Sequence, residues 1–387
     1  MSNKIQVQAI LPSQWDETRL KAILRKMRNR RILIVGDIGV DRYTVGSVSR
    51  ISPEAPVPII AVERERLKLG LAANVADNVR ALGGQAQLLG VIGRDRTADD
   101  LRKLCVEAHL SAKLLVVDPS RRTILKERLM TERQQLLRVD YESEGGISAA
   151  AEDEVVRRAR LAIKDCDAVV LEDYSKGLFS LRVAKSIVSI ASEQGKLLAV
   201  DPHDKSEIQM YHGATVLKPN LREAEGLSGV RIRDQGSLAE AGRRILDTTG
   251  ARHLVITLGK DGMALFSADT TVVSLMPTYA RDVYDVSGAG DTVISVLTLA
   301  LAAGASWTEA CILGNVAGGI VVGKWGTVTV APEEIQAVLE TVCRPTAGRP
   351  TSGRSTTTKN RAEAAERVGK SSRSGKVGKG AKVSQER

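Results

Sequence analysis

A short string of small and acidic residues in the last third of the chain is best suited to chemistry. Residues 285–292 read DVSGAGDT, and an apolar stretch typical of a helix, Val293 to Ala303, follows. Small residues before a helix let the backbone approach a ligand closely, and the first-turn N–H groups with the helix dipole favour an anion. The string therefore predicts a phosphate-binding corner.

Asp291 stands where that helix is expected to begin. A carboxylate there can cap the helix, or it can take a proton from a hydroxyl group that attacks a phosphate held in the same corner. The residue types alone leave both roles open. The sequence contains no G-x-x-x-x-G-K-[ST], no H-R-D and no D-F-G string, which argues against a P-loop enzyme and against a protein kinase.

Four further charged residues are candidates for binding a substrate. Asp41 follows the first buried run and either accepts hydrogen bonds from sugar hydroxyls or caps its loop. Lys176 follows the buried run 168–171 and either meets an anion or faces solvent. Arg50 and Arg138 lie in segments with many polar interruptions, where a guanidinium either grips a phosphate or is solvated.

The string KPNLRE at residues 218–223 follows another buried run and offers oxygen ligands. Asn220 and Glu223 suit Mg²⁺, which keeps several waters, so we expect Glu223 to act on the metal through water. The same two residues have the spacing of a capping box that begins the next helix. The two roles are compatible.

Buried apolar runs alternate with helical patterns along most of the chain, which predicts a doubly wound, mainly parallel α/β sheet. Ligands bind at the carboxyl ends of the strands in such sheets. The expected strands are 31–36, 86–92, 168–171, 197–200, 214–218, 253–257 and 263–266. The expected helices are 72–82, 96–108, 149–163, 181–193 and 237–248.

The chain divides by composition into three parts. Residues 1–30 are predicted to be a helical N-terminal appendage, and 31–343 the catalytic domain, with β-rich lid segments near 41–65 and 112–140. Residues 344–387 hold 12 Lys and Arg against 3 Asp and Glu, and few large apolar residues, so we expect a disordered basic tail. Most of the net charge of +10 therefore belongs to this tail.

Several classes of protein are disfavoured by composition. The four cysteines are far apart and form no C-x-x-C pair, which argues against a disulfide framework and a zinc site. No secretory signal and no apolar run long enough for a membrane span are present, so we expect a cytoplasmic protein without membrane insertion.

The string at residues 285–291 resembles the second signature of the ribokinase (PfkB) family of carbohydrate kinases, D-[TV]-[TS]-G-A-G-D. The resemblance implies a ribokinase-like fold and phosphoryl transfer from ATP with Mg²⁺. It implies that Asp291 is the catalytic base and that the amides of Gly288, Ala289 and Gly290 stabilise the transferred phosphoryl group. Ser287 would lie beside the nucleotide.

Other segments resemble one branch of that family, the D-glycero-β-D-manno-heptose-7-phosphate kinases. They are GDIGVDRY at 36–43, SRISPEAPVP at 49–58, QQLLRVD at 134–140 and DYSKG at 173–177. The resemblance implies phosphorylation of the anomeric hydroxyl in lipopolysaccharide core synthesis, and a homodimer. It implies sugar-binding roles for Asp41, Gly70, Asn74, Arg50, Arg138 and Lys176, and nucleotide-binding roles for Asn220, Glu223, Thr257, Gly259, Gly262, Ser287 and Asn315.

One departure from the family keeps other functions in view. The family usually has Gly-Gly before Ala-Ala-Asn, whereas this chain has Gly70-Leu71, and a side chain there would reshape a sugar pocket. A kinase for another sugar is therefore an alternative, and a non-catalytic scaffold is a further one. The tail is a candidate for binding nucleic acid, but we favour a solubilising extension. No H-x-G-H adenylyltransferase motif is present.

Overall fold

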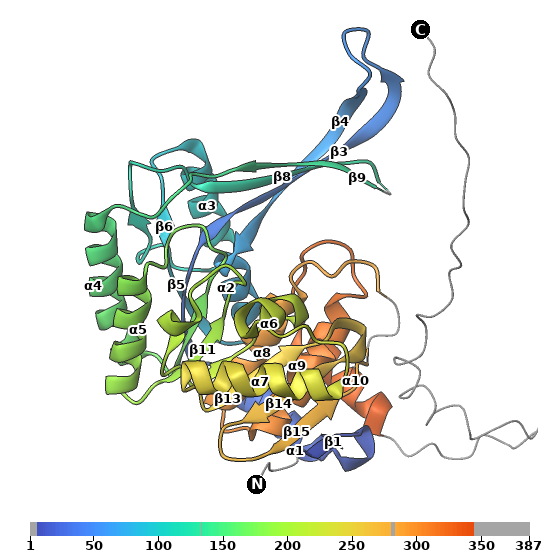
Figure 1. Cartoon of the computed structure of the whole chain (residues 1–387). Coiled ribbons are helices and arrows are strands. Elements are labelled where there is room, and N and C mark those ends of the chain that lie inside the picture. Colours follow the sequence, from blue (N-terminus) through green and yellow to red (C-terminus); the bar gives the residue numbers. More distant parts are fainter. Residues whose placement is uncertain (1–5, 133, 280–282, 344–387) are drawn as a thin grey trace, which may run out of the picture.

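The computed structural model describes residues 6–132, 134–279 and 283–343, so the predicted tail, 344–387, lies outside the described residues. The described residues build an α/β body in which a large sheet lies between helices. A smaller sheet continues from the body into a long projecting hairpin (Figure 1).

The main sheet is parallel except at β14, which runs antiparallel to both of its neighbours. Its order is β1 (Gln6–Ala9), β15 (Val272–Met276), β14 (Met263–Ser267), β13 (His253–Thr257), β12 (Val216–Leu217), β11 (Leu197–Asp201), β10 (Ala168–Glu172), β2 (Arg31–Gly36) and β5 (Gln85–Leu89). The predicted doubly wound α/β fold is confirmed.

Helices cover both faces of this sheet, which is why its central strands are apolar without interruption. In β2, Ile32 and Ile34 face one core and Leu33 and Val35 face the other. The first core contains α1 (Glu17–Met27), α2 (Ala72–Ala81), α3 (Arg96–Glu107), α8 (Ala289–Ala302), α9 (Trp307–Val321) and α10 (Pro332–Cys343). The second contains α4 (Ala149–Asp165), α5 (Leu181–Glu193), α6 (Leu221–Ser228) and α7 (Gln235–Thr249).

The smaller sheet, called the lid below, has four strands in the order β4 (Pro58–Leu71), β3 (Ile38–Ile51), β8 (Ile124–Met130) and β9 (Gln135–Tyr141). β3 follows β2 after a single residue, so the lid grows directly out of the main sheet. The outer halves of β3 and β4 extend beyond β8 and form the projecting hairpin (Figure 1).

Two regions that bear on the architecture differ from the sequence-based prediction. The single strand expected at 86–92 is divided at Gly90 into β5 and β6 (Val91–Ile92), and β6 pairs with β7 (Val116–Val117). A Cβ at Gly90 would lie 2.6 Å from the carbonyl oxygen of Gly36, so the bend requires glycine. Residues 6–27 are also integrated into the body, because β1 joins the main sheet and α1 buries its apolar side in the first core.

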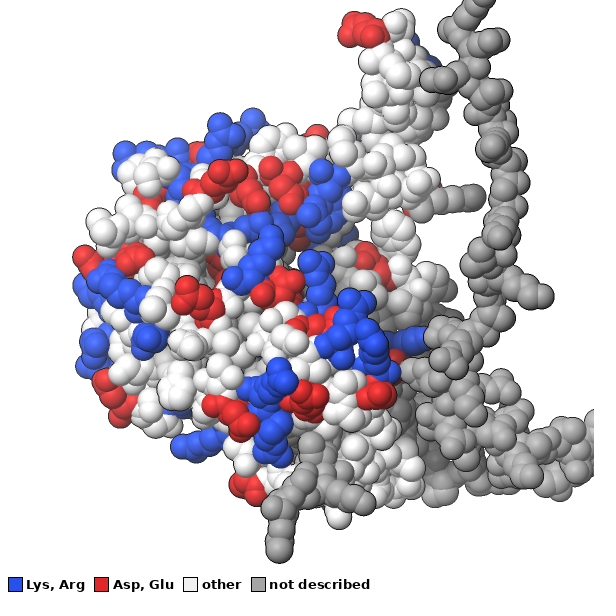
Figure 2. All heavy atoms as spheres, viewed as in Figure 1, with Lys and Arg blue, Asp and Glu red and all other residues white. Residues whose placement is uncertain are grey.

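The remaining features concern the surface and the thiols. All four cysteines lie in the described residues and are free. Within 6–132, 134–279 and 283–343, no helix combines the length and the apolar character needed to cross a bilayer. On the face shown in Figure 2, acidic and basic side chains are interspersed over the body.

Candidate active site

The phosphate-binding corner predicted from sequence lies at the N-terminus of α8. Gly288 caps the helix with a φ of 79°, a left-handed conformation that favours glycine. A Cβ there would lie 2.9 Å from Thr327 Cγ2 and 3.1 Å from Asn74 Nδ2. Thr292 N–H donates to the Gly288 carbonyl, and Ala289 N–H donates to the Val286 carbonyl at 3.3 Å, so the N–H groups left at the helix end are those of Gly290 and Asp291.

Asp291 lies in the first turn of α8 with both carboxylate oxygens engaged. Its Oδ2 accepts a hydrogen bond from Asn74 Nδ2 at 2.6 Å, and its Oδ1 accepts one from the Tyr174 hydroxyl at 2.9 Å. Burial raises the pKa of Asp291, and the bond from Asn74 opposes that rise. The carboxylate is thus oriented by two neutral donors and borders a cavity.

A buried cation faces the glycines of the corner. Lys218 is 2% exposed and pairs with Asp201 at 2.8 Å. Its Nζ would lie 3.4 Å from a Cβ at Gly290. Burial alone would lower the pKa of Lys218, but the attraction of Asp201 and other nearby carboxylates outweighs that effect. The pKa of Lys218 is therefore raised, and the lysine is charged. The corner therefore combines helix N–H groups with one fixed positive charge.

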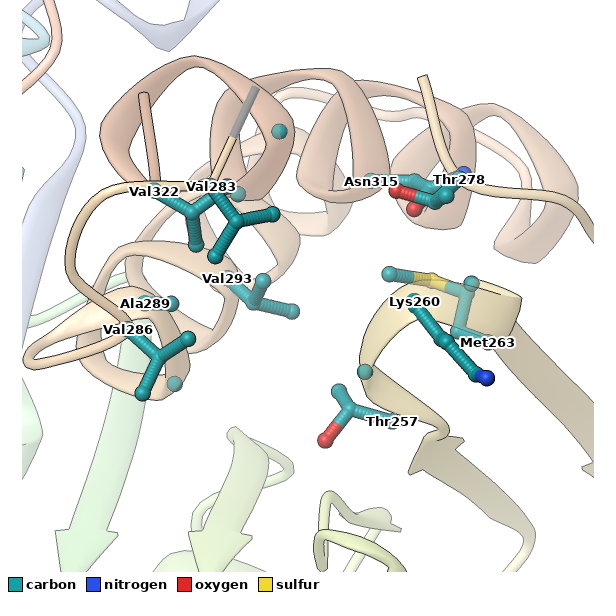
Figure 3. A pocket seen from close by; sticks show the side chains of 15 residues that line it. Thr257, Lys260, Met263, Thr278, Val283, Val286, Ala289, Val293, Asn315 and Val322 are labelled. Atoms are coloured by element: carbon teal, nitrogen blue, oxygen red, sulfur yellow. The ribbon is translucent and has the colours of Figure 1, made fainter. Parts of the chain in front are cut away.

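Two adjoining cavities meet at this corner. The first has a volume of about 340 Å³ and contains the predicted residues Thr257, Gly259, Gly262 and Asn315. In Figure 3, four valines line one side of it and Thr257, Lys260 and Met263 the other; the valines are Val283, Val286, Val293 and Val322. An apolar wall opposite one that carries the hydroxyl of Thr257 and the ammonium of Lys260 suits a flat heterocyclic base.

The second cavity, of about 600 Å³, contains Asn220, Glu223, Lys218 and Asp291. Thr257, Gly259, Ala289 and Gly290 border both cavities, so the two are continuous around the start of α8. Together they form an elongated site that leads from an apolar chamber to the proposed base. Ser287 borders neither cavity; its N–H donates to Asp285 Oδ1 at 2.9 Å.

Glu223 and Asn220 form the capping box that their spacing indicated. Glu223 N–H donates to Asn220 Oδ1 at 2.9 Å, and Asn220 N–H donates to the Glu223 carboxylate at 2.7 Å. Burial, aided by Asp201, raises the pKa of Glu223 to about 7. Two mutually repelling carboxylates beside a cavity suit a divalent cation, although no cluster of three or more potential metal ligands occurs among the described residues.

Three of the sugar-binding residues expected from sequence, Asp41, Gly70 and Asn74, lie close together on the Asn74 side of Asp291. Asp41 is buried in β3, and a Cβ at Gly70 would lie 3.1 Å from its Oδ2. Asn74, in the first turn of α2, links this region to Asp291. Asp41 also pairs with Arg128 Nη1 at 2.6 Å, a partner that sequence reasoning missed.

The face of the lid that carries Asp41 is strongly basic. Because strand neighbours in register share a face, Lys126, Arg128 and Arg138 lie on the same face as Asp41. Lys126 Nζ lies 5.7 Å from the centre of the Tyr174 ring, and no ion pair with Lys126 occurs among the described residues.

The other two predicted cations behave differently. Lys176, which follows β10, pairs with Glu142 at 2.7 Å. Burial lowers the pKa of Lys126, and the positive charge of Lys176 lowers it further. Arg50 is exposed near the end of β3, nine residues beyond Asp41. That separation corresponds to about 30 Å of extended strand. Arg50 therefore does not join the site of its own chain.

Sequence reasoning missed the residues whose roles depend on distant partners. Tyr174, Arg128 and Asp201 meet Asp291, Asp41 and Lys218 only through the fold, and Lys126 meets Tyr174 in the same way. The available signal was positional, because Tyr174 and Asp201 stand at or just after the carboxyl ends of β10 and β11.

Comparison with known proteins gives a consistent set of relatives. Residues 30–334 match the model of the pfkB family carbohydrate kinases. The chain is 44% identical over 310 residues to the bifunctional protein HldE of Desulfatibacillum aliphaticivorans, which covers 80% of this chain and 63% of that protein. It is 39% identical to HldE of Geobacter metallireducens over 83% of this chain and 65% of the relative. The chain thus spans somewhat less than two thirds of these relatives.

Solved structures with the same fold are more distant in sequence. Phosphofructokinase-2 from Escherichia coli, solved with potassium, aligns with a TM-score of 0.68 at 19% identity over 82% of this chain and all of that chain. Ribokinase from Arabidopsis thaliana, solved with ribose and ATP, aligns with a TM-score of 0.64 at 16% identity over 81% of this chain and 99% of that chain. These similarities confirm a ribokinase-like fold.

Proposed function

The chain belongs to the pfkB family of carbohydrate kinases, and from that premise we propose that it transfers the γ-phosphoryl group of ATP to the anomeric hydroxyl of D-glycero-β-D-manno-heptose 7-phosphate. The observation that carries this proposal is the carboxylate of Asp291, held by two hydrogen bonds at the mouth of the phosphate-binding corner. The similarity to HldE proteins and the heptose-kinase strings at 36–43 and 49–58 support the choice of sugar.

In the proposed reaction, Asp291 takes the proton of the acceptor hydroxyl. The acceptor oxygen bonds to the γ-phosphorus, the bond from that phosphorus to the bridging oxygen breaks, and ADP leaves. The N–H groups at the start of α8 and the Lys218 ammonium lie where they can stabilise the transferred group. The products are the 1,7-bisphosphate and ADP.

Nucleotide and metal have distinct places in this proposal. The adenine of ATP would occupy the cavity lined by Thr257 and Asn315, and the phosphates would extend toward Gly290. Mg²⁺ would be held by the phosphates and, through water, by Glu223; when bound, it neutralises phosphate charge. Glu223 fits that role because its pKa is raised by burial and by the nearby Asp201, a repulsion that a cation relieves.

The basic face of the lid suits the phosphate that the acceptor already carries. Lys126 stands out because it lies over Tyr174, which donates to the Asp291 carboxylate, and because it has no ion pair among the described residues. We propose that Lys126 and Arg128 bind the 7-phosphate, with Arg138 and Lys176 farther along the same cluster. Asp41 and Asn74 would then position the sugar ring between the two phosphates.

The proposed acceptor can be tested with a panel of sugars. We expect the highest kcat/KM with the heptose 7-phosphate, and a new phosphorus resonance from an anomeric phosphate. Lys126→Met should raise the KM for phosphorylated acceptors tenfold or more, since a charge-assisted contact contributes about 1.5–3 kcal/mol. Lys185→Met, on the exposed side of α5, is the control.

Two results would contradict parts of this proposal. Faster turnover of an unphosphorylated sugar would remove the heptose 7-phosphate and favour the alternative of a different acceptor. Normal ATP binding without turnover of any sugar would favour a non-catalytic scaffold.

Assembly and location complete the proposal. The projecting hairpin exposes several large apolar residues, which are Val48, Ile51, Val57 and Val62. A two-stranded ribbon is marginally stable alone, so we propose that it pairs with a second copy of the chain in a homodimer. Arg50 would act on a substrate only in the site of such a partner. Dependence on ATP is consistent with a cytoplasmic enzyme.

A further inference from the structure

Asp37 is the one residue between β2 and β3, and its side chain is buried. Its carboxylate accepts three backbone hydrogen bonds from the loop that follows β10. The donors are the N–H groups of Tyr174 at 3.2 Å, Lys176 at 3.0 Å and Leu178 at 3.1 Å. Asp37 is not among the site residues that were expected from sequence.

The loop needs this acceptor because its backbone is irregular. Ser175 and Gly177 have φ values of 55° and 98°, so successive N–H groups turn toward one point instead of toward a strand or helix partner. An ionised carboxylate satisfies all three donors with two oxygens. Asparagine has the same shape but offers only one acceptor oxygen, and its NH₂ group would face the remaining backbone N–H donors.

The main chain of Asp37 holds a second element. Its carbonyl oxygen accepts the N–H of Ala72, the first residue of α2, at 3.0 Å. The first turn of α2 carries Asn74, and the loop carries Tyr174. Among the described residues, these two donate the hydrogen bonds to the Asp291 carboxylate. Asp37 is thus bonded to both elements that orient the proposed base.

We propose that Asp37 is a positioning residue for phosphoryl transfer, which fixes Tyr174 and Asn74 so that both oxygens of Asp291 are held toward the acceptor. The inference rests on the proposed function only in taking Asp291 as the base. The loop is also held by Arg121, which donates to the Lys176 carbonyl, and by Ile147 N–H, which donates to the Gly177 carbonyl. The chain should therefore still fold when Asp37 is replaced.

The test compares Asp37→Asn with a matched control, Asp167→Asn. Asp167 accepts the N–H of Arg31 at 2.7 Å, at the opposite ends of the same two strands, β2 and β10. Turnover is measured with whichever acceptor the wild type uses fastest. We expect Asp37→Asn to lower kcat by about 10- to 100-fold, because small displacements of a reacting group are costly, with ATP affinity unchanged. Asp167→Asn should leave kcat within twofold.

A pH profile separates positioning from a loss of stability. Losing a hydrogen-bond donor favours the protonated form of Asp291, so the acid limb of kcat should move to higher pH in Asp37→Asn. The other charged groups around Asp291 are Glu172, Asp201 and Lys218, which the variant leaves in place. In combination with Tyr174→Phe, the second substitution should add little, because both remove the same contact.

Hydrogen exchange tests the geometry without any substrate. Peptides covering residues 173–178 should exchange faster in Asp37→Asn and at the wild-type rate in Asp167→Asn. Two results would overturn the positioning role even where kcat falls. One is an acid limb of kcat that does not move in Asp37→Asn. The other is a double variant whose loss of kcat equals the product of the losses in Asp37→Asn and Tyr174→Phe. Failure of the wild type to phosphorylate any sugar would instead count against the proposed function, while exchange would still report on Asp37.

Discussion

At the scale of single residues, the site concentrates carboxylates around one buried ammonium. Glu172, Asp201 and Asp291 surround Lys218, and burial together with Asp201 holds the pKa of Glu172 well above its usual range. Such an arrangement is unfavourable for stability by itself, because each charge loses its hydration. The arrangement fits an enzyme in which the N-terminus of α8 and Lys218 bind a phosphate while the nearby carboxylate of Asp291 accepts a proton.

The pH dependence of stability offers a test at this scale. Burial raises the pKa of Asp37 to about 6 from an ordinary value of 3.8, against the lowering effect of its backbone hydrogen bonds. Because the pKa of Asp37 is higher in the folded than in the unfolded chain, protonated Asp37 contributes to the free energy of unfolding below pH 4. This contribution is lost as the pH rises through 6. The free energy of unfolding of the wild type, relative to Asp37→Asn, should fall by about 3 kcal/mol over that interval. Urea unfolding at several pH values measures it, and parallel curves would contradict it.

The residues that could be predicted from sequence are those whose roles are local. Asp291 stands in a signature at a helix start, and Asn220 and Glu223 have capping-box spacing. Lys126 and Arg128 were not predicted because their importance comes from a lid register that brings β8 beside β3. Arg50 was predicted from its string, but strand length carries it away from the site.

At the scale of elements, the junction between β4 and α2 carries backbone strain. Leu71 is the N-cap of α2, with φ 59° and ψ −137°, a region that residues with a Cβ rarely adopt. It is 6% exposed and borders neither of the two cavities at Asp291. The expected effect of Leu71 on a sugar pocket therefore stays a prediction, whereas its conformation has a direct consequence for stability.

The strain predicts an unusual order of stability among substitutions. Leu71→Gly and Leu71→Ala both lose the buried side chain, but only glycine relieves the positive φ, so Leu71→Gly should be more stable by about 1 kcal/mol. Leu69, on the same strand and also 6% exposed, should show the reverse order, because glycine weakens an ordinary strand. Thermal denaturation of the four variants measures both differences. The same order at both positions would contradict strain at Leu71.

Strands that are buried on both faces of the main sheet could be predicted from the sequence, whereas strands at the edges of the sheets could not. The continuous apolar run 31–36 indicated a central strand, and β2 occupies those residues. β1 reads QVQA and is exposed along its length, so no apolar pattern marks it as a strand. The division of 86–92 at Gly90 depends on a backbone contact with Gly36, which no local pattern encodes.

At the scale of the whole molecule, contacts within a single chain do not account for the projecting hairpin. Its large apolar side chains are solvent-exposed, including Ile51 at 61% and Val62 at 53%. Much of the projection is uncharged on the face shown in Figure 2. Exposed apolar ribbons of this kind mark surfaces for a partner, and a second copy of the chain would cover both ribbons at once.

Measurement of molar mass in solution tests the dimer. We expect about twice the 41.6 kDa of the chain, and a shift toward the monomer for Ile51→Asp combined with Val62→Asp, because two buried charges would oppose association. Leu161→Asp, on α4, is the control, since its exposed fraction of 53% equals that of Val62. A wild type that stays monomeric at micromolar concentration would contradict the proposed assembly.

The most direct measurement is the turnover of Asp291→Asn under saturating ATP and acceptor. Asparagine keeps the size of the side chain but cannot accept the hydroxyl proton as a base, so we expect kcat to fall by about 10²- to 10⁴-fold. The affinity for ATP should stay within a few-fold of the wild type, because the nucleotide cavity around Thr257 and Asn315 is unchanged. A kcat within tenfold of the wild type would show that Asp291 is not the base.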